Sequence, residues 1–149
     1  MALLYPPTGF HFLVRFDLFP APADTRFQSV AGLSVETEFE EVAEGGQRQY
    51  KHQLPVRTKH GDLILKRGMH IGSTLTEWFN DAFENFTYKP TNLEVILLNE
   101  LHSPLRAWRI EHALPKKLEV SSFNAESSEL VIETLTLTYH YIKVINELP

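Results

Sequence analysis

Histidine is the residue type in this sequence best suited to metal binding or proton transfer. The chain contains seven: His11, His52, His60, His70, His102, His112 and His140. They form no His-Glu-x-x-His or His-x-His pattern, and no expected helix carries two of them on one face. The absence of cysteine excludes a thiolate metal site, a cysteine nucleophile and a disulfide framework. The sequence therefore predicts no metal site, and the histidines are interpreted as scattered surface residues.

Other catalytic patterns are missing as well. Ser121, Ser122, Ser127 and Ser128 lie among turn-forming residues and lack the Gly-x-Ser-x-Gly elbow that exposes a nucleophile. The glycine pair at 45–46 lacks the lysine and the helix of a phosphate-binding loop. Adjacent carboxylates at 40 and 41 would point to opposite faces of a strand, which prevents acid–base cooperation. The protein is expected not to be an enzyme and to bind no cofactor.

Composition indicates an ordinary folded domain. The chain has 149 residues, of which 43% are hydrophobic, and this length predicts one domain over residues 1–149. No apolar run approaches the roughly 18 residues that a membrane helix needs, and the first residues lack the basic start of a signal peptide. The net charge of −5 argues against a nucleic-acid binder, because phosphate contacts need clustered bases. The monomer is expected not to bind membranes.

Alternation of apolar and polar residues with a period of two dominates the chain and predicts strands. The expected strands are 10–18, 27–42, 62–66, 92–99, 105–113, 117–121 and 130–144. In the second of these, Leu33, Val35, Thr37 and Phe39 are expected to share one face, opposite the glutamates.

One segment has a helical period instead. Residues 73–85 place Leu75, Trp78, Phe79, Ala82 and Phe83 on one face, with Thr74 and Glu77 spaced as a capping box. Such an apolar stripe must be buried, so the helix is expected to cover a sheet. The predicted fold class is mainly β: a small β-barrel or two packed antiparallel sheets with one flanking α-helix.

The stretch 44–61 has no clear period and contains the breakers Gly45, Gly46, Pro55 and Gly61. Long irregular segments in compact domains are uncommon and are usually functional or disordered. This stretch is either a contact arm or a solvated loop.

Short motifs in a fixed order cover residues 5–145. They include segments 30–36, 44–46, 54–59, 63–68, 114–117 and 123–127, which read VAGLSVE, EGG, LPVRTK, LILKRG, LPKK and FNAES. This ordered series resembles the tail-tube (inner tube) family of contractile phage tails and phage-tail-like contractile injection systems.

The resemblance implies two packed β-sheets forming a small barrel, six subunits per ring, and rings stacked into a hollow tube inside a contractile sheath. It also implies an arm at 44–61 that reaches neighbouring subunits or rings, and a lumen lined by strands of all six subunits. The implied partners are further copies of the chain, a sheath protein, and spike, hub and baseplate proteins. Protein cargo or phage DNA would occupy the lumen. The subunit would assemble in the bacterial cytoplasm and then become part of an extracellular, membrane-anchored or virion particle.

Charge is distributed unevenly over the expected contact region. Residues 33–44 carry five acids and no base, whereas 45–70 carry six bases against one acid. If the two segments meet across a ring-to-ring contact, complementary charge would set their register and make stacking sensitive to salt. The candidate contact residues are Glu36, Glu38, Glu40, Glu44, Arg48, Tyr50, Lys51, Arg57, Lys59, Lys66 and Arg67.

Two alternatives remain open. Within the family, the chain could be the main tube subunit or a specialised first-ring subunit that joins the tube to the spike and hub. Outside the family, a free β-barrel module could hold a sugar or peptide on Tyr5, Phe10, Tyr50, Tyr88, Trp108 and Tyr139. Aromatic residues that alternate on strands are more often part of a core.

Overall fold

The computed structural model describes residues 11–18, 26–42, 52–69, 73–122, 126 and 131–145. Their elements are β1 (His11–Phe16), β2 (Arg26–Phe27), β3 (Ser29–Ala31), β4 (Glu36–Val42), β5 (His52–Lys59), β6 (Leu63–Gly68), α1 (Thr74–Asn85), β7 (Thr91–Leu98), β8 (Pro104–Val120), β9 (Ile132–Thr138) and β10 (Tyr141–Ile145). The mainly β architecture with one helix confirms the predicted fold class. Among the described residues, no helix is long and apolar enough to cross a membrane.

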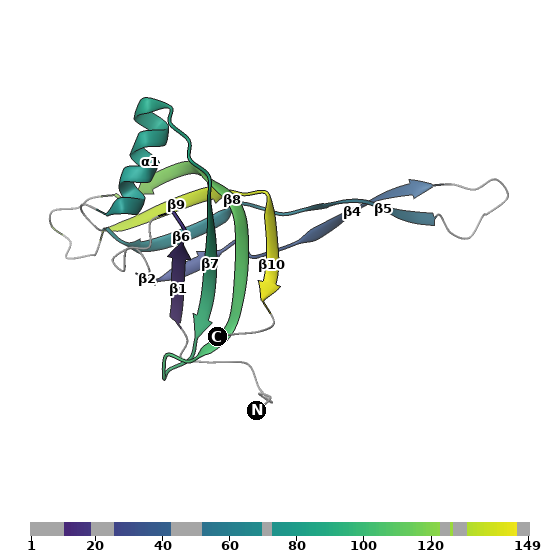
Figure 1. The fold of residues 1–149 in the computed structure, drawn as a ribbon, viewed down its shortest axis with the longest axis horizontal. Helices are drawn as coiled ribbons and strands as arrows, with labels where there is room; N and C mark the ends of the chain where they lie inside the picture. Colours follow the sequence, from purple (N-terminus) through teal and green to yellow (C-terminus); the bar gives the residue numbers. More distant parts are fainter. Residues whose placement is uncertain are drawn as a thin grey trace.

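The long strand β8 connects two halves of one antiparallel sheet. The strand order is β2-β1-β7-β8-β9-β6-β3, and β10 also pairs with β8. Residues 104–113 of β8 pair with β7, and residues 114–120 pair with β9. Figure 1 shows the two halves running in different directions, with α1 at one end. The first half, β1-β7-β8-β10, and the second half, β8-β9-β6-β3, enclose one core.

The core contains the apolar positions that alternation predicts. Val14 and Phe16 of β1, Leu93 of β7, Leu65 of β6 and Leu135 of β9 are all buried. Their side chains belong to one cluster that also includes aromatic residues of α1. The other positions of each strand point to the opposite face of the first half, where Arg15, Glu94 and Arg109 are partly exposed. Ile96 and Ala107 point to the same face but are buried.

Helix α1 has the predicted extent and buried face, but its N-cap is one residue earlier than expected. Ser73 has extended backbone angles (φ −76°, ψ 147°), and its side chain accepts a hydrogen bond from the Thr76 backbone N–H at 3.0 Å. Thr74 is already helical, so the proposed capping box of Thr74 and Glu77 was wrong. Phe83, expected in the buried stripe, is exposed.

The expected strand 27–42 is three strands, because the chain leaves the sheet at Gly32. Gly32 has a φ of +92°, and its carbonyl accepts from the Ser34 N–H at 2.9 Å. Beyond this turn, β4 pairs only with β5 among the described residues. Val35 and Phe39 are therefore exposed, so the apolar face expected for this strand is not covered by the rest of the described chain.

Two other strand boundaries differ from the prediction. The expected break between 113 and 117 is absent, because a register shift between Pro115 and Lys117 accommodates a proline without an N–H group. The expected single strand 130–144 divides at Tyr139–His140, where the chain turns from β9 to β10 and pairs with the other half of β8.

Candidate assembly surfaces

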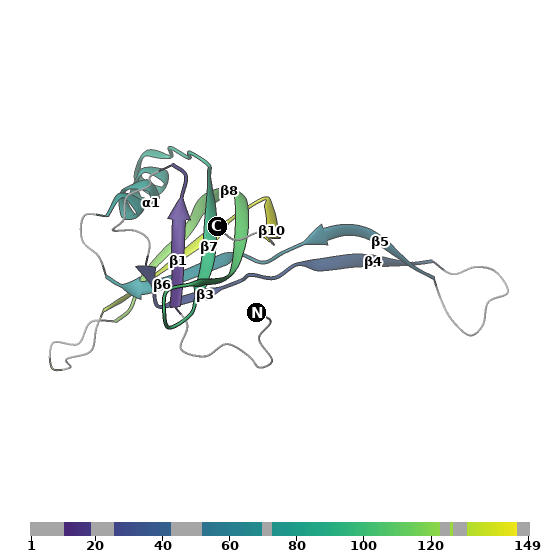
Figure 2. The same ribbon diagram turned by 60° about the horizontal axis from the view of Figure 1, so that its bottom comes forward.

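The most prominent surface feature is the ribbon of β4 and β5, here called the arm. It projects from the body of the subunit in both views (Figures 1 and 2). Its strands pair antiparallel, with a register shift between Glu38 and Phe39. All residues of β5 are exposed. The predicted irregular segment 44–61 is thus a strand over 52–59, and its residues 44–51 lie outside the described part of the chain.

The arm carries large apolar side chains that the subunit itself does not cover. The exposed ones are Phe39 (53%), Val42 (37%), Leu54 (51%) and Val56 (49%). A two-stranded ribbon without a further layer is marginally stable in water, and a group of exposed apolar side chains marks an interaction surface. The arm therefore has the surface of a segment that packs against another protein chain.

The opposite charges of the arm face each other within one subunit. Glu36 lies opposite Lys59, and Glu38 lies opposite Arg57. The Arg57 Nε atom is 2.9 Å from Glu38 Oε2. The sequence suggested that these segments meet across a ring-to-ring contact, but their pairing in the hairpin accounts for their complementary charge without a second subunit.

The other candidate contact residues are distributed differently. Glu40 lies on the arm opposite Leu54, and Lys66 is exposed on β6. Glu44, Arg48, Tyr50 and Lys51 lie outside the described residues.

Arg67 is not a surface residue, contrary to the prediction, since only 4% of it is exposed. Its guanidinium forms a buried ion pair with Glu133 of β9, which is 2% exposed. The same guanidinium donates to the Ser73 hydroxyl at 2.8 Å and lies 5.3 Å from the centre of the Phe27 ring. This pair joins β6, β9 and the start of α1.

The buried ion pair of Glu133 with Arg67 was not predicted, although the sequence pattern around both residues indicates it. Glu133 lies on the same strand face as Leu135 and Leu137, and Arg67 lies on the same face as Leu63 and Leu65, so both charges occupy core-facing positions. Two opposite charges on apolar strand faces indicate a buried pair rather than a surface contact.

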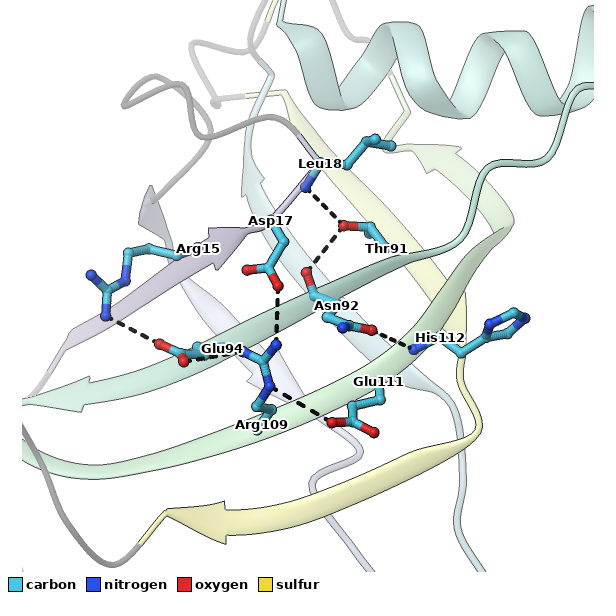
Figure 3. Close-up of polar contacts among 9 residues, drawn as sticks. All are labelled: Arg15, Asp17, Leu18, Thr91, Asn92, Glu94, Arg109, Glu111 and His112. Carbon is cyan, nitrogen blue, oxygen red and sulfur yellow. Dashed lines mark hydrogen bonds and ion pairs between the residues drawn. The ribbon is translucent and has the colours of Figure 1, made fainter.

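The outward face of the first half carries a connected group of ions, the charged row: Arg15, Asp17, Glu94, Arg109 and Glu111 (Figure 3). Arg109 donates to Glu94 at 3.2 Å and to Asp17 at 3.0 Å. Arg15 donates to the other oxygen of Glu94 at 3.1 Å, and Glu111 is 3.8 Å from Arg109. Burial opposes the charge of Arg109, but its hydrogen bond to Asp17 and the nearby carboxylates outweigh burial and raise its pKa.

An irregularity beside the charged row is stabilised by a side chain. Between Leu93 and Thr91, β8 contains one more residue than β7, and His112 adopts a φ of +57° there. The Asn92 side-chain oxygen accepts from the His112 backbone N–H at 3.1 Å (Figure 3). This bond satisfies a donor that the bulge removes from the strand pairing.

The described residues form neither the aromatic strip nor the metal site that a ligand-binding module could use. Trp108 and Tyr139 pack on the core and Tyr88 is exposed, so these three do not form one aromatic strip. Tyr5, Phe10 and Tyr50 lie outside the described residues. Within the described ranges, no three histidine or acidic side chains are arranged to hold a metal ion.

A hollow of about 660 Å³ lies along β1, lined by His11, Phe12, Leu13, Arg15, Phe27, Ile96, Leu98, His102 and Pro104. His11 and His102 approach each other at 2.9 Å there. The hollow is the place where a small ligand would bind if the chain were a binding module.

Comparison with known proteins supports an assembly role. The sequence model of the T4-like virus tail tube protein gp19 family matches residues 8–143. A chain in the anti-feeding prophage baseplate is similar at 31% identity and a TM-score of 0.83, over 97% of both chains. None of the curated proteins matches the sequence.

More distant solved structures share the fold. A chain in the sheath–tube complex of an extracellular contractile injection system, PVC, is 23% identical, with a TM-score of 0.79 over 96% of this chain and 93% of that one. Hcp1 from Flavobacterium johnsoniae is 13% identical, with a TM-score of 0.60 over 90% of this chain and 94% of its own.

Proposed function

The chain belongs to the T4-like virus tail tube protein family and is a tail-tube-like structural protein of contractile injection systems, and we propose that it forms hexameric rings that stack into the inner tube. The tube is a hollow conduit for protein cargo or phage DNA, inside a contractile sheath. The subunit assembles in the bacterial cytoplasm and then becomes part of a contractile particle. It acts as a structural component and not as an enzyme.

The observation that carries this proposal is the arm. Phe39, Leu54 and Val56 are about half exposed on a ribbon that extends from the body and packs on no other described strand. Contact with a neighbouring subunit or ring would bury these side chains and support the ribbon. Such a contact is heterologous, which closes into a ring when the rotation between subunits allows it.

The borders of the first half also suit ring formation. Strand β10 is at one border, and β1 is near the other, where β2 pairs only with Phe12 and Leu13 among the described residues. Unpaired strand edges tend to pair with other chains, so a ring can join the border of one subunit to that of the next. The hollow along β1 lies at this border and would be covered by the neighbour.

The charged row faces the lumen in this proposal. The opposite face of the same strands is occupied by the core, with Val14 and Ile110 fully buried. Because Arg15 and Arg109 are already paired with carboxylates, the wall presents both signs of charge and suits passage of cargo without tight binding.

A second candidate is the first-ring subunit that joins the tube to the spike, hub and baseplate. It is supported by the 31% identity to a chain of a baseplate, against 23% to a chain of a sheath–tube complex. Mixing the protein with the hub and sheath proteins separates the roles. A first-ring subunit would bind the hub and stop at one ring, whereas the main subunit would elongate into tubes that bind the sheath protein.

Ring formation is tested by measuring molecular mass over a range of protein concentrations. The proposal predicts a species at six times the 17.2 kDa subunit mass, together with larger stacks. A species that remains at the subunit mass and binds a sugar or peptide would instead support the free binding module.

Reversing two charges on the arm tests its electrostatic contribution. Replacement of both Arg57 and Lys59 by glutamate is expected to weaken stacking, because it sets like charges against Glu36 and Glu38. The monomer should stay folded, since exposed ion pairs contribute only about 0–1 kcal/mol. Mass distribution at low and high salt reports stacking, and thermal unfolding reports the fold.

The reciprocal changes Glu36→Lys and Glu38→Arg, added to the reversed pair, provide the control. If pairing within the arm matters, the four-fold variant should recover stacking. If the charges instead pair with other residues of the next ring, which the variant leaves unchanged, stacking should remain weak. Unchanged stacking in the original double variant would contradict an electrostatic role of the arm.

A further inference from the structure

The arm joins the body through two short segments, 32–35 and 60–62, here called the arm root. The His60 ring stacks on the ring of Tyr139, which lies at the corner between β9 and β10. The ring centres are 3.9 Å apart, and the planes are inclined by only 5°. The segment that leaves β5 is therefore in flat contact with the body of the subunit.

The second segment of the root is held by the same tyrosine. The Tyr139 hydroxyl donates to the Gly32 carbonyl at 3.2 Å. Gly32 has a φ of +92°, and a Cβ at this position would lie 1.9 Å from the Asp62 carbonyl oxygen. The two segments of the root thus touch each other, and Tyr139 contacts both of them.

Both ring nitrogens of His60 approach carbonyl oxygens. Nδ1 is 3.1 Å from the Gly61 oxygen, and Nε2 is 3.2 Å from the His140 oxygen. A neutral imidazole can donate from only one nitrogen, so one of these contacts then sets a lone pair against an oxygen. A second proton would allow both nitrogens to donate and would add a cation–π attraction to Tyr139.

Charged and titratable groups on both sides of His60 would affect a protonated ring differently. Asp62, two residues along the chain, has the charge opposite to that of a protonated ring, but it is paired with Lys116 of β8 at 2.6 Å. On the far side, the His140 ring stacks on His112 at 3.9 Å, and these two rings would repel if both were charged.

Tyr139 remains a donor over the range in which histidine titrates. Burial, with a contribution from Asp62, raises the pKa of its hydroxyl above the ordinary value of 10.0. The bond to Gly32 is therefore present on both sides of the histidine transition, and any pH dependence of the root arises from the histidines.

We propose that His60 and Tyr139 position the arm and that protonation of His60 tightens the arm root, so that the arm is held more firmly at low pH. Arm ordering is a property of the single subunit. Its consequence, stronger ring or stack formation at lower pH, rests on the function proposed above.

Hydrogen exchange of the arm in a dilute, monomeric sample tests the proposal. Exchange of residues 36–42 and 52–59, corrected for the intrinsic pH effect, would be compared at about pH 5.5 and about pH 7.5, on either side of the ordinary histidine pKa. We expect exchange to be slower at the lower pH by at least roughly two- to five-fold, since a cation–π contact on a buried ring is at least as strong as an exposed one.

Three variants identify the groups involved. His60→Gln should remove the pH dependence, whereas His102→Gln, which changes an exposed histidine that contacts His11, should retain it. Tyr139→Phe keeps a stacking ring but loses the bond to Gly32, so arm exchange should be faster at both pH values with its pH dependence preserved. A wild-type arm without pH dependence, or full pH dependence in His60→Gln, would overturn the proposal.

Molecular mass measured at the same two pH values separates this inference from the tube function. A pH-dependent arm in a protein that stays monomeric at all concentrations, with and without the hub and sheath proteins, would support the positioning role and contradict tube assembly. Rings whose arm exchange does not change with pH would support tube assembly and contradict the role of His60 protonation.

Discussion

Replacing Glu133 by alanine is expected to lower the free energy of unfolding by about 3–5 kcal/mol, because it leaves the Arg67 guanidinium buried without its carboxylate. Small domains are stable by only about 5–15 kcal/mol, so this change removes a large part of the total. Urea denaturation of the monomer measures the loss. The start of α1 should also loosen, since Arg67 donates to the Ser73 hydroxyl that caps the helix.

Two further variants show whether the loss comes from the unpaired charge. Glu119→Ala breaks an exposed pair with Lys117 at 3.6 Å and should cost no more than about 1 kcal/mol. The double change Arg67→Met and Glu133→Leu removes both buried charges and should recover most of the stability. Equal costs for Glu133→Ala and Glu119→Ala would show that the buried pair has no special role.

Replacing Phe39 and Leu54 on the arm by serine is expected to abolish ring and tube formation. Both side chains are about half exposed in the subunit, so the change should alter the monomer little. Full burial of such a side chain contributes about 1.5–3 kcal/mol. Because each of the two is already half buried, losing both weakens each contact by roughly ten- to a hundred-fold. A ring contains several such contacts, which multiplies the effect.

Sedimentation of wild type and variant at equal concentration measures the loss of assembly. Leu101→Ser is the matched control, because Leu101 is 83% exposed on the β7–β8 turn, away from the arm. We expect the control to assemble like the wild type. Tubes of normal length in the Phe39 and Leu54 double variant would show that the apolar surface of the arm makes no assembly contact.

The parts of the fold that could be predicted are those with a local pattern tied to burial. Val14 and Phe16 alternate with polar residues in β1, and Trp78 and Phe79 lie on the apolar face of α1. The burial of each of these residues therefore follows from the pattern of its own strand or helix. The arm could not be placed in this way. Glu36, Glu38 and Glu40 alternate with apolar residues as they would in a half-buried strand, but the ribbon leaves the body and both its faces are exposed.

The candidate surfaces depend on contacts between distant residues. Arg67 and Glu133 are 66 residues apart, and His60 contacts the carbonyl of a residue 80 positions away. Neither contact has a local signature. Arg67 and Glu133 do share their strand faces with buried leucines, which marks both charges as core-facing. The sequence predicted separate strands 105–113 and 117–121, but a register shift between Pro115 and Lys117 allows β8 to continue. Family motifs predicted the architecture. The charge pairing inside the arm could be recognised only from the register of β4 and β5 in the structure.

The most direct test of tube formation is negative-stain electron microscopy of the purified protein, alone and mixed with its candidate sheath and hub partners. Six-fold rings or hollow rods are the predicted result for the wild type, and neither should form when Phe39 and Leu54 are replaced by serine. Particles of subunit size under every condition, with and without these partners, would contradict the account.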